Sequence, residues 1–321
     1  MKRGYITLAF GSEHYLRIAR NLARSLRRSG STLPLAIITD LDDHDLTDFD
    51  ATIPLDGTLG NTLLHKLSLD TYSPFEETIF LDSDCLVARN PDYLFDSFPG
   101  RHFTVVGDMV DAGEWFGTEI EELRHKLGIA DKIPKFNSGF IYWISCAETA
   151  RLFAGARELW DDYDDLGFGQ FRTNLVRADE PLFAIAMARN GVAASPDDGT
   201  VMNTPIGLSG RVRLNLSKQL SQFVKHGRSV HPAVVHFCGF YRFGGSYRRE
   251  AFYLSARANR TELVARRLAN FIYAIPVALD HGAVWAGARA LFRTVRAILL
   301  GGRRGTEPSV ATPSRTPRSP G

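Results

Sequence analysis

Along the first third of the chain, short continuous apolar runs alternate with stretches in which apolar residues recur at helical spacing. This pattern predicts strands that alternate with helices. Residues 5–10 (YITLAF) form a short apolar run typical of a buried strand. Similar runs at residues 33–40 and 78–84 predict a second and a third strand, with a helix at residues 63–72 between them. After Ser12, which provides an N-cap, apolar residues recur at helical spacing at Leu16, Ala19, Leu22 and Leu26.

The second half of the chain continues this mixed pattern. Residues 136–144 (FNSGFIYWI) predict a strand, followed by a helix at residues 147–160. Pro181 suits the first turn of another helix, and residues 233–245 predict a strand that runs into a loop rich in glycine and aromatic residues. Strands that alternate with helices favour an α/β fold with a mainly parallel sheet, in which ligands bind beyond the carboxyl ends of the strands. Asp40 and the pair Asp82 and Asp84 occupy such strand ends.

Composition excludes several classes of protein. Of the 321 residues, 44% are hydrophobic and 23% are charged, which excludes a disordered or fibrous chain. The three cysteines, Cys85, Cys146 and Cys238, form no CxxC pair, which excludes a disulfide scaffold and a cysteine-based zinc site. No apolar run reaches the roughly 20 residues of a bilayer span, and the first residues do not read as a signal peptide. We therefore expect a cytoplasmic protein.

The net charge of +2 hides an asymmetry between the two ends of the chain. Residues 241–304 hold 12 Arg against three acidic residues, a charge of +9, whereas residues 1–240 carry −8. Near the C-terminus an apolar stripe recurs every three or four residues, and Arg289, Arg293 and Arg296 flank it. Such a basic helix either lies peripherally on the anionic inner face of a membrane or packs on the preceding domain. The stripe consists of Val284, Trp285, Ala288, Leu291, Phe292, Val295, Ile298 and Leu299.

The sequence FLDSDCLV, residues 80–87, contains the strongest chemical signal. An apolar strand delivers Asp82 and Asp84 two positions apart, so both carboxylates can converge on one cation just past the strand. A hard divalent ion takes carboxylate oxygen and readily shares its shell with phosphate, which makes this a candidate metal–diphosphate site. The alternative is a polar loop that only caps the strand and the next helix.

Six segments in this order resemble the metal-dependent glycosyltransferases of the GT-A fold, most closely family 8, which includes glycogenin and bacterial galactosyltransferases. The resemblance implies a Rossmann-like, mixed and mainly parallel sheet flanked by helices over residues 1–245. It does not cover the C-terminal region, where the residue pattern itself predicts a basic helical extension (246–302) and the lack of apolar residues predicts a disordered tail (303–321). It also implies retaining transfer of a hexose from a UDP-sugar to a glycan, lipid-linked or protein acceptor, with no nucleic-acid partner. The six segments are TLAFGSEHYLRIARNLARSL, HKLSL, LDSD, FNSG, ADE and HFCGFYR.

The resemblance also assigns roles to individual residues. Asp82, Asp84 and His236 would bind the metal, which would be Mn²⁺ (or Mg²⁺), and one imidazole among the ligands favours Mn²⁺ over Ca²⁺. Asp179 and Glu180 would lie beside the anomeric carbon as catalytic residues. The nucleotide-sugar would be held by Ala9, Tyr15, Lys66, Ser83, Asn137, Ser138, Gly239 and Arg242.

Three positions depart from the family pattern. Arg242 stands where the family has lysine, Glu180 where it has glutamine, and GSEH precedes Tyr15 in place of an Asn-Asp pattern. Asp179 also has an alternative interpretation, as the N-cap of the helix that Pro181 begins. The alternatives for the whole chain are an inactive carbohydrate-binding or scaffold relative and a haloacid-dehalogenase-type phosphatase. In the phosphatase motif Thr or Val stands two residues past the second Asp, where this chain has Leu86.

Overall fold

The computed structural model describes residues 2–41, 46–169, 176–257 and 260–287. Of the predicted apolar stripe, only Val284 and Trp285 fall in these ranges. The rest of the predicted basic helix and the predicted disordered tail lie outside the described residues. None of the helices in the described ranges combines the length and the apolar content that a bilayer span requires.

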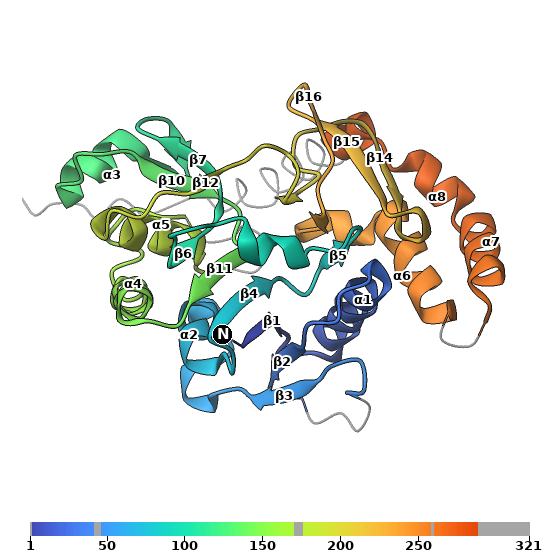
Figure 1. Cartoon of the computed structure of the whole chain (residues 1–321). Helices are drawn as coiled ribbons and strands as arrows, with labels where there is room; N and C mark the ends of the chain where they lie inside the picture. Colours follow the sequence, from blue (N-terminus) through green and yellow to red (C-terminus); the bar gives the residue numbers. More distant parts are fainter. Residues whose placement is uncertain (1, 42–45, 170–175, 258–259, 288–321) are drawn as a thin grey trace, which may run out of the picture.

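A mixed, mainly parallel sheet forms the centre of the molecule (Figure 1). Within the described residues, six strands build it in the order β3-β2-β1-β4-β11-β6. The strands β3, β2, β1 and β4 run parallel, and β11 is antiparallel to both β4 and β6. The strands are β1 (Arg3–Leu8), β2 (Leu35–Thr39), β3 (Ala51–Pro54), β4 (Glu77–Leu81), β6 (Phe103–Thr104) and β11 (Phe140–Ile144).

Helices cover both faces of this sheet. Successive side chains of a strand point to opposite sides, and the strands β1, β2 and β4 carry apolar side chains on both sides, so each face has to be covered. Tyr5 and Ile79 pack towards helix α1 (Glu13–Ser29), whereas Ile6 and Phe80 pack towards the helices on the other face. Burial on both faces explains why these strands read as continuous apolar runs. The helices of the second face are α2 (Leu69–Tyr72), α4 (Ala147–Glu158) and α5 (Glu180–Arg189), with a 3₁₀ turn at Leu63–Ser68.

Two predicted elements differ in the structure. The predicted helix at residues 63–72 is divided into the 3₁₀ turn and α2. The predicted strand at residues 136–144 is divided by the turn Asn137-Ser138-Gly139, because β10 (Ile133–Phe136) leaves the central sheet and pairs with β7 (Val106–Val110). The same small sheet includes β12 (Ser195–Pro196), and a hairpin of β8 (Glu114–Trp115) and β9 (Thr118–Glu119) leads into α3 (Ile120–Leu127) beside it.

A second small sheet adjoins the end of β4. It has the order β13-β17-β5, with β13 (Met202–Asn203), β17 (Val234–His236) and β5 (Cys85–Val87). His236 pairs with Cys85 across β17 and β5, and Asn203 pairs with Val235 across β13 and β17. Helix α1 packs against β5.

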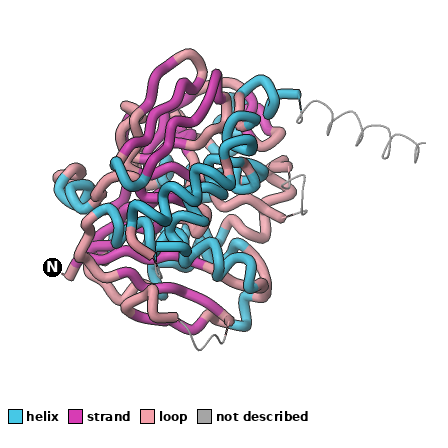
Figure 2. The backbone as a smooth tube through the Cα atoms, turned by 90° about the vertical axis from the view of Figure 1, so that its right-hand side faces the viewer, coloured by secondary structure: helices cyan, strands magenta, loops and turns pink. Residues whose placement is uncertain are grey.

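The C-terminal part of the chain packs on the body. A three-stranded sheet of β14 (Leu208–Asn215), β15 (Leu220–Lys225) and β16 (Arg228–Val230) contacts helix α6 (Gly245–Arg257). Helix α6 in turn contacts α1, α7 (Glu262–Ile272) and α8 (Ala274–Leu279). In Figure 2 these helices cover the side of the molecule that faces the viewer, and the strands of this three-stranded sheet lie at the top of the view.

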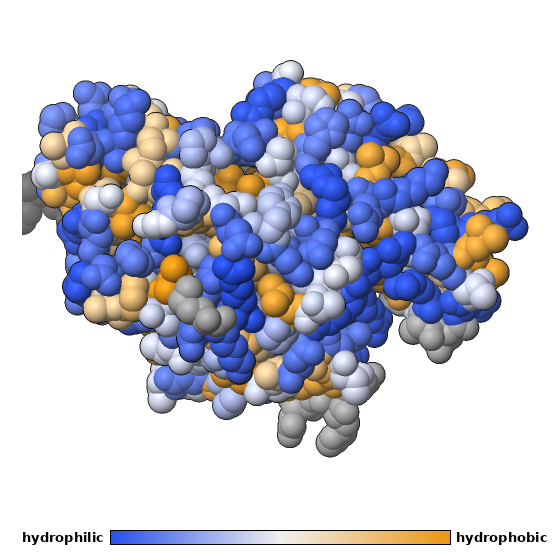
Figure 3. Space-filling model, in the orientation of Figure 1, coloured by the Kyte–Doolittle hydropathy of each residue, from blue (hydrophilic) through white to orange (hydrophobic). Residues whose placement is uncertain are grey.

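A deep cleft separates two lobes of the molecule above the central sheet. One lobe carries β7 and β10, and the other carries β14, β15 and β16 (Figure 1); Figure 3 shows the surface hollowed between them. The cleft has a volume of about 2090 Å³. Its floor includes the end of β4, where Asp82 and Asp84 lie.

Candidate active site

The turn that follows β4 holds the two carboxylates at the floor of the cleft. The backbone N–H of Asp82 donates to the carbonyl of Gly139 on the neighbouring strand at 3.1 Å, which fixes the exit of the chain from the sheet. The N–H of Cys85 then donates to the carbonyl of Asp82 at 3.0 Å and closes the turn. Ser83 and Asp84 are buried within it. Because β5 starts immediately afterwards, both carboxylates have a rigid backbone on each side.

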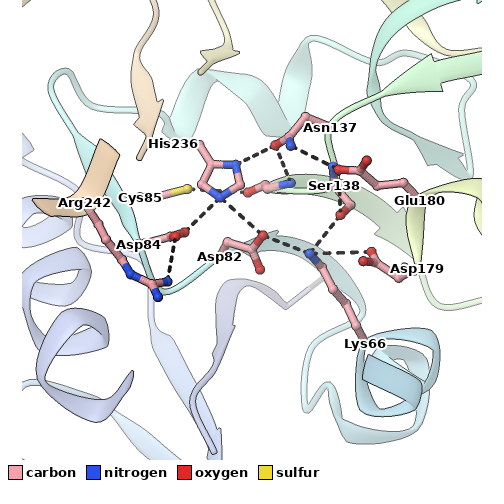
Figure 4. A network of polar contacts seen from close by, with 11 residues as sticks. Lys66, Asp82, Asp84, Cys85, Asn137, Ser138, Asp179, Glu180, His236 and Arg242 are labelled. Carbon is pink, nitrogen blue, oxygen red and sulfur yellow. Dashed lines mark hydrogen bonds and ion pairs between the residues drawn. The ribbon is translucent and has the colours of Figure 1, made fainter. Parts of the chain in front are cut away.

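His236 joins this pair from a distant part of the sequence. Its strand β17 lies beside β5, and the pairing with Cys85 brings the imidazole to the two carboxylates. Nε2 of His236 lies 2.8 Å from Oδ1 of Asp84 and 3.5 Å from Oδ2 of Asp82 (Figure 4). Ligand atoms of the three residues all lie within 4.8 Å of one another.

This donor set fits a divalent cation. Two carboxylate oxygens and one imidazole nitrogen gather at the floor of the cleft, and divalent first-row cations accept this mixed oxygen and nitrogen ligand set. The ring is also held in the orientation that coordination needs, since Nδ1 lies 2.5 Å from Oδ1 of Asn137. Burial acts to lower the pKa of His236, but the charge of Asp84 and its hydrogen bond outweigh it and raise the pKa, so without a metal Nε2 donates to Asp84. A bound cation would displace this proton and leave a neutral imidazole that donates from Nδ1 to Asn137 and offers the lone pair of Nε2 to the ion.

Asn137 and Ser138 connect the histidine to Glu180. The side chain of Asn137 donates to Oε1 of Glu180 at 3.0 Å, and the backbone N–H of Ser138 donates to the same oxygen at 3.0 Å. These residues lie in the turn between β10 and β11, which opens at the same edge of the sheet as the end of β4. One hydrogen-bonded network therefore joins the candidate metal ligands to the start of α5.

Lys66 makes the second link across the site. Its Nζ donates to Oδ2 of Asp82 and to Oγ of Ser138, both at 2.9 Å, and lies 3.5 Å from Oδ2 of Asp179. Burial acts to lower the pKa of Lys66, but the charges of Asp179 and Asp82 outweigh it and raise the pKa above its usual value. The buried ammonium is therefore charged and neutralises carboxylates at both ends of the site.

The two aspartates of the turn differ in their electrostatics. Burial raises the pKa of Asp82, against the charges of Lys66 and His236. The pKa of Asp84 is lowered, because the charge of His236 and its hydrogen bond outweigh burial and Arg242 adds to them. Nη1 of Arg242 lies 3.9 Å from Oδ2 of Asp84. An ionised Asp84 with a cation beside it suits a site for a metal and a phosphate.

Asp179 and Glu180 open helix α5 and face the cleft. The N-cap interpretation of Asp179 fails, because its side chain makes no cap hydrogen bond and its Oδ2 has no hydrogen-bond partner among the described residues. Its partner is instead the charge of Lys66. Burial, followed by the neighbouring charge of Asp179, raises the pKa of Glu180 to about 7. Such a shift marks Glu180 as a candidate functional group.

Most residues predicted from the sequence do line the cleft, and one does not. Ala9 is packed against Leu16 and Ile37 in the core, and its neighbours Phe10 and Gly11 line the cleft instead. Asp40, at the end of β2, accepts hydrogen bonds from the backbone N–H of Gly11 and supports this turn. The predicted residues that line the cleft are Tyr15, Lys66, Asp82, Ser83, Asp84, Asn137, Ser138, Asp179, Glu180, His236, Gly239 and Arg242.

Part of the cleft wall was not predicted. Lys225 and Arg228 come from the hairpin β15–β16, and Lys135 comes from β10. Trp285, predicted in the apolar stripe of the C-terminal helix, lines the cleft and donates its indole N–H to Oδ1 of Asp280 at 2.6 Å. No motif marks any of these residues, since their position depends on how the hairpin and the C-terminal segment fold back over the sheet.

Comparison of the sequence with known proteins identifies plant relatives. No family model matches the chain. Galactinol synthase 5 of Arabidopsis thaliana is 26% identical over 153 residues, which are 42% of this chain and 44% of that protein. Galactinol synthase 10 of the same plant is 25% identical over 152 residues, or 42% of this chain and 45% of that protein. The chain therefore matches less than half the length of these curated relatives.

Comparison of the structure identifies the fold. The chain is similar to the galactosyltransferase LgtC, whose crystal structure was determined in complex with donor and acceptor sugar analogs. The TM-score is 0.51 at 15% identity, and the match covers 74% of this chain and 87% of that one. Both comparisons confirm the resemblance inferred from the six sequence segments. The chain thus has the GT-A fold and resembles, in sequence, the glycosyltransferases of the family 8 type.

Proposed function

We propose that this chain is a metal-dependent, retaining glycosyltransferase that moves a hexose from a UDP-sugar to a glycan, lipid-linked or protein acceptor. The observation that carries the proposal is the cluster of Asp82, Asp84 and His236 on the floor of the cleft. Asn137 connects this cluster by hydrogen bonds to Glu180, at the place where a donor sugar would lie. The GT-A fold and the similarity to galactinol synthases support this assignment.

The cluster would hold Mn²⁺ or Mg²⁺ with the diphosphate of the donor. A bound divalent ion supplies positive charge that stabilises the nucleoside diphosphate as it leaves the sugar. The chain adds its own cations, since Arg242 lies beside Asp84 and Lys66 lies beside Asp82. Preorganised charges of this kind stabilise a leaving group without further reorganisation. Tyr15 lines the cleft and would contact the base. The guanidinium carbon of Arg242 lies over the ring of Tyr15, 5.8 Å from the ring centroid.

Asp179 and Glu180 would act on the sugar. The bond to the leaving phosphate breaks with positive charge on the anomeric carbon, and a carboxylate close to that carbon stabilises this charge. Glu180 is held for this role by Asn137 and Ser138, while Asp179 is held by Lys66. In retaining transfer through one face of the sugar, the leaving phosphate accepts the proton of the acceptor hydroxyl, so no separate base is required.

The location of the protein stays a prediction, as does its division into three parts. Helices α7 and α8 expose large apolar side chains, including Leu263, Phe271 and Ile275, within a basic region of the sequence. These features support the predicted peripheral contact with an anionic membrane surface. Sedimentation with vesicles that contain anionic lipid tests this prediction, and equal sedimentation with neutral vesicles would contradict it.

The proposed activity is tested by the release of UDP from a panel of UDP-hexoses without an acceptor. Each donor is incubated with the purified chain and Mn²⁺, and again with a chelator. Release from one donor that requires the metal supports the proposal and identifies the sugar. A chain that neither releases UDP nor binds any nucleotide with Mn²⁺ would instead be an inactive carbohydrate-binding or scaffold relative.

A further inference from the structure

The part of the cleft beyond His236 contains a cation that the proposed chemistry does not use. Across the small sheet, β17 lies between β5 and β13, and α1 packs against β5. Asp84 immediately precedes β5 and lies 3.9 Å from Arg242, whose guanidinium lies over the ring of Tyr15. The nucleotide end with Tyr15 therefore lies on the β5 side of His236, and Asn203 of β13 lies on the other side. The Nζ of Lys225 donates to Oδ1 of Asn203 at 3.1 Å. Lys225 is thus on the side of the candidate metal centre away from the nucleotide end.

Asp197 and Asp108 act on the charge of Lys225 from a distance, and their effect on its pKa is smaller than that of burial. Within the described parts of the chain, no carboxylate oxygen lies within the 4.0 Å of an ion pair from its Nζ, and its hydrogen bond goes to a neutral amide. Asp197 stands nearby, but its Oδ1 accepts from the side chain of Asn203 at 3.0 Å and pairs with Arg228 at 3.4 Å. Lys225 is partly buried, and this burial lowers its pKa. A desolvated ammonium of this kind gains most from an anionic partner.

The opposite wall of the cleft does not cancel this charge. Asp108 of β7 lines it, but Lys135 of β10 lies directly opposite Asp108 in the ladder of these two strands. The charged residues named on the two walls are therefore three cations, Lys135, Lys225 and Arg228, against the two carboxylates Asp108 and Asp197. Of these cations, Lys225 has two N–H groups beyond the one bonded to Asn203, and it lines the cleft.

We propose that the acceptor of the transfer carries an anionic group, a phosphate or a carboxylate, and that Lys225 binds this group. This inference rests on the proposed function, because it assigns the half of the cleft beyond His236 to the acceptor. Lys225 would give charge-assisted hydrogen bonds to the anion, with Arg228 and Lys135 adding to the positive potential. A neutral acceptor would leave the desolvated ammonium without compensation, so the site selects between acceptors by charge.

The test measures binding by isothermal titration calorimetry on the full chain. The chain is first titrated with UDP in the presence of Mn²⁺, and this complex is then titrated with glucose 6-phosphate, glucuronate and glucose. We expect at least one of the two anions to bind about tenfold or more tightly than glucose, as a charged hydrogen bond implies. The better of the two anions distinguishes phosphate from carboxylate. Lys225→Ala should remove the preference while leaving the affinity for UDP unchanged.

Lys218→Ala is the matched control, because Lys218 is exposed and lies near the other end of the same hairpin. It should keep the preference for anions. Equal affinity for glucose and both anions, or no binding of either anion at millimolar concentration, overturns the inference. So does a Lys225→Ala variant that keeps the preference or that loses affinity for UDP. If the wild-type chain does not bind UDP with Mn²⁺, the proposed function fails separately, and the same three titrations without nucleotide still decide the question of the anion.

Discussion

Oδ1 of Asn137 lies 2.5 Å from Nδ1 of His236, although the two residues are 99 positions apart in the sequence. This contact determines which ring nitrogen of His236 faces the carboxylates of Asp82 and Asp84. The same asparagine donates to Glu180 through its amide nitrogen. Its two polar atoms therefore orient one residue of the candidate metal centre and one residue of the candidate sugar site.

Replacing Asn137 by alanine should weaken metal binding although Asn137 is not itself a ligand. His236 then loses the acceptor that orients its ring, and loss of such a partner typically lowers metal affinity about 10- to 100-fold. Titration of the variant with Mn²⁺ in the presence of UDP measures this change. Asn190→Ala, at the far end of α5, is the control and should bind Mn²⁺ as the wild-type chain does. An unchanged affinity in the Asn137 variant would show that the contact does not orient the histidine.

Gly139→Ala should also displace His236, for a steric reason. A Cβ atom at position 139 would lie 2.3 Å from Nδ1 of the imidazole, so the ring must move. We expect about a tenfold or larger loss of Mn²⁺ affinity with little change in the fold, since the φ angle of Gly139 lies outside the left-handed region. Gly155→Ala serves as the comparison, because its Cβ would meet nothing closer than 4.0 Å. If both variants bind Mn²⁺ equally well, the steric argument is wrong.

Glu180→Gln should change how stability depends on pH. The pKa of Glu180 is raised to about 7 in the folded chain, from a reference value of 4.5, so the folded state holds the proton more tightly. Stability therefore falls as the pH rises from about 4.5 to about 7, by on the order of 3 kcal/mol for this group. Glutamine cannot ionise, so the variant should not show this decrease. The Tm of the variant minus that of the wild-type chain should therefore be larger at pH 8 than at pH 5. Parallel pH profiles of Tm for the metal-free proteins would contradict the shift.

Glu250→Ala should destabilise the chain without affecting the site. Glu250 is fully buried, makes two hydrogen bonds with Arg266 of α7 at 2.8 and 2.7 Å, and accepts from the backbone of Leu216 at 3.1 Å. Removing one partner of such a buried pair costs about 3–5 kcal/mol. Unfolding in urea measures the loss. Glu262→Ala removes a half-exposed ion pair with Arg28 and should cost less than about 1 kcal/mol. Similar losses in the two variants would mean that the buried pair does not hold α6 and α7 on the body.

The local pattern of the sequence was sufficient for the buried parallel strands of the central sheet and for the N-cap of α1. Strands β1, β2 and β4 are buried on both faces and so appear as apolar runs, and Ser12 caps α1 as predicted. Strand β3 was not predicted, because most of its residues are exposed and it carries little apolar signal. The break at Asn137 was missed for a different reason. The apolar run continues through it, and only pairing with β7 takes β10 out of the sheet.

The site shows the same division between local and long-range information. Asp82 and Asp84 are visible as a motif because one strand end carries both. The roles of Asn137, Asp179 and His236 came from the family resemblance, and the structure brings these residues together. Lys225 and Trp285 could not be predicted, because a hairpin and a C-terminal segment bring them to the cleft through contacts far apart in sequence.

The most direct test of the account is Mn²⁺ binding by the wild-type chain with UDP, compared with Asp84→Asn and His236→Ala. The control is Asp164→Asn, which removes a surface carboxylate that pairs with Arg177. Electron paramagnetic resonance of the bound ion reports both occupancy and nitrogen coordination. We expect one Mn²⁺ per chain with a nitrogen ligand, retained in the control and lost or strongly weakened in the two site variants. Unchanged Mn²⁺ binding in both site variants would contradict it.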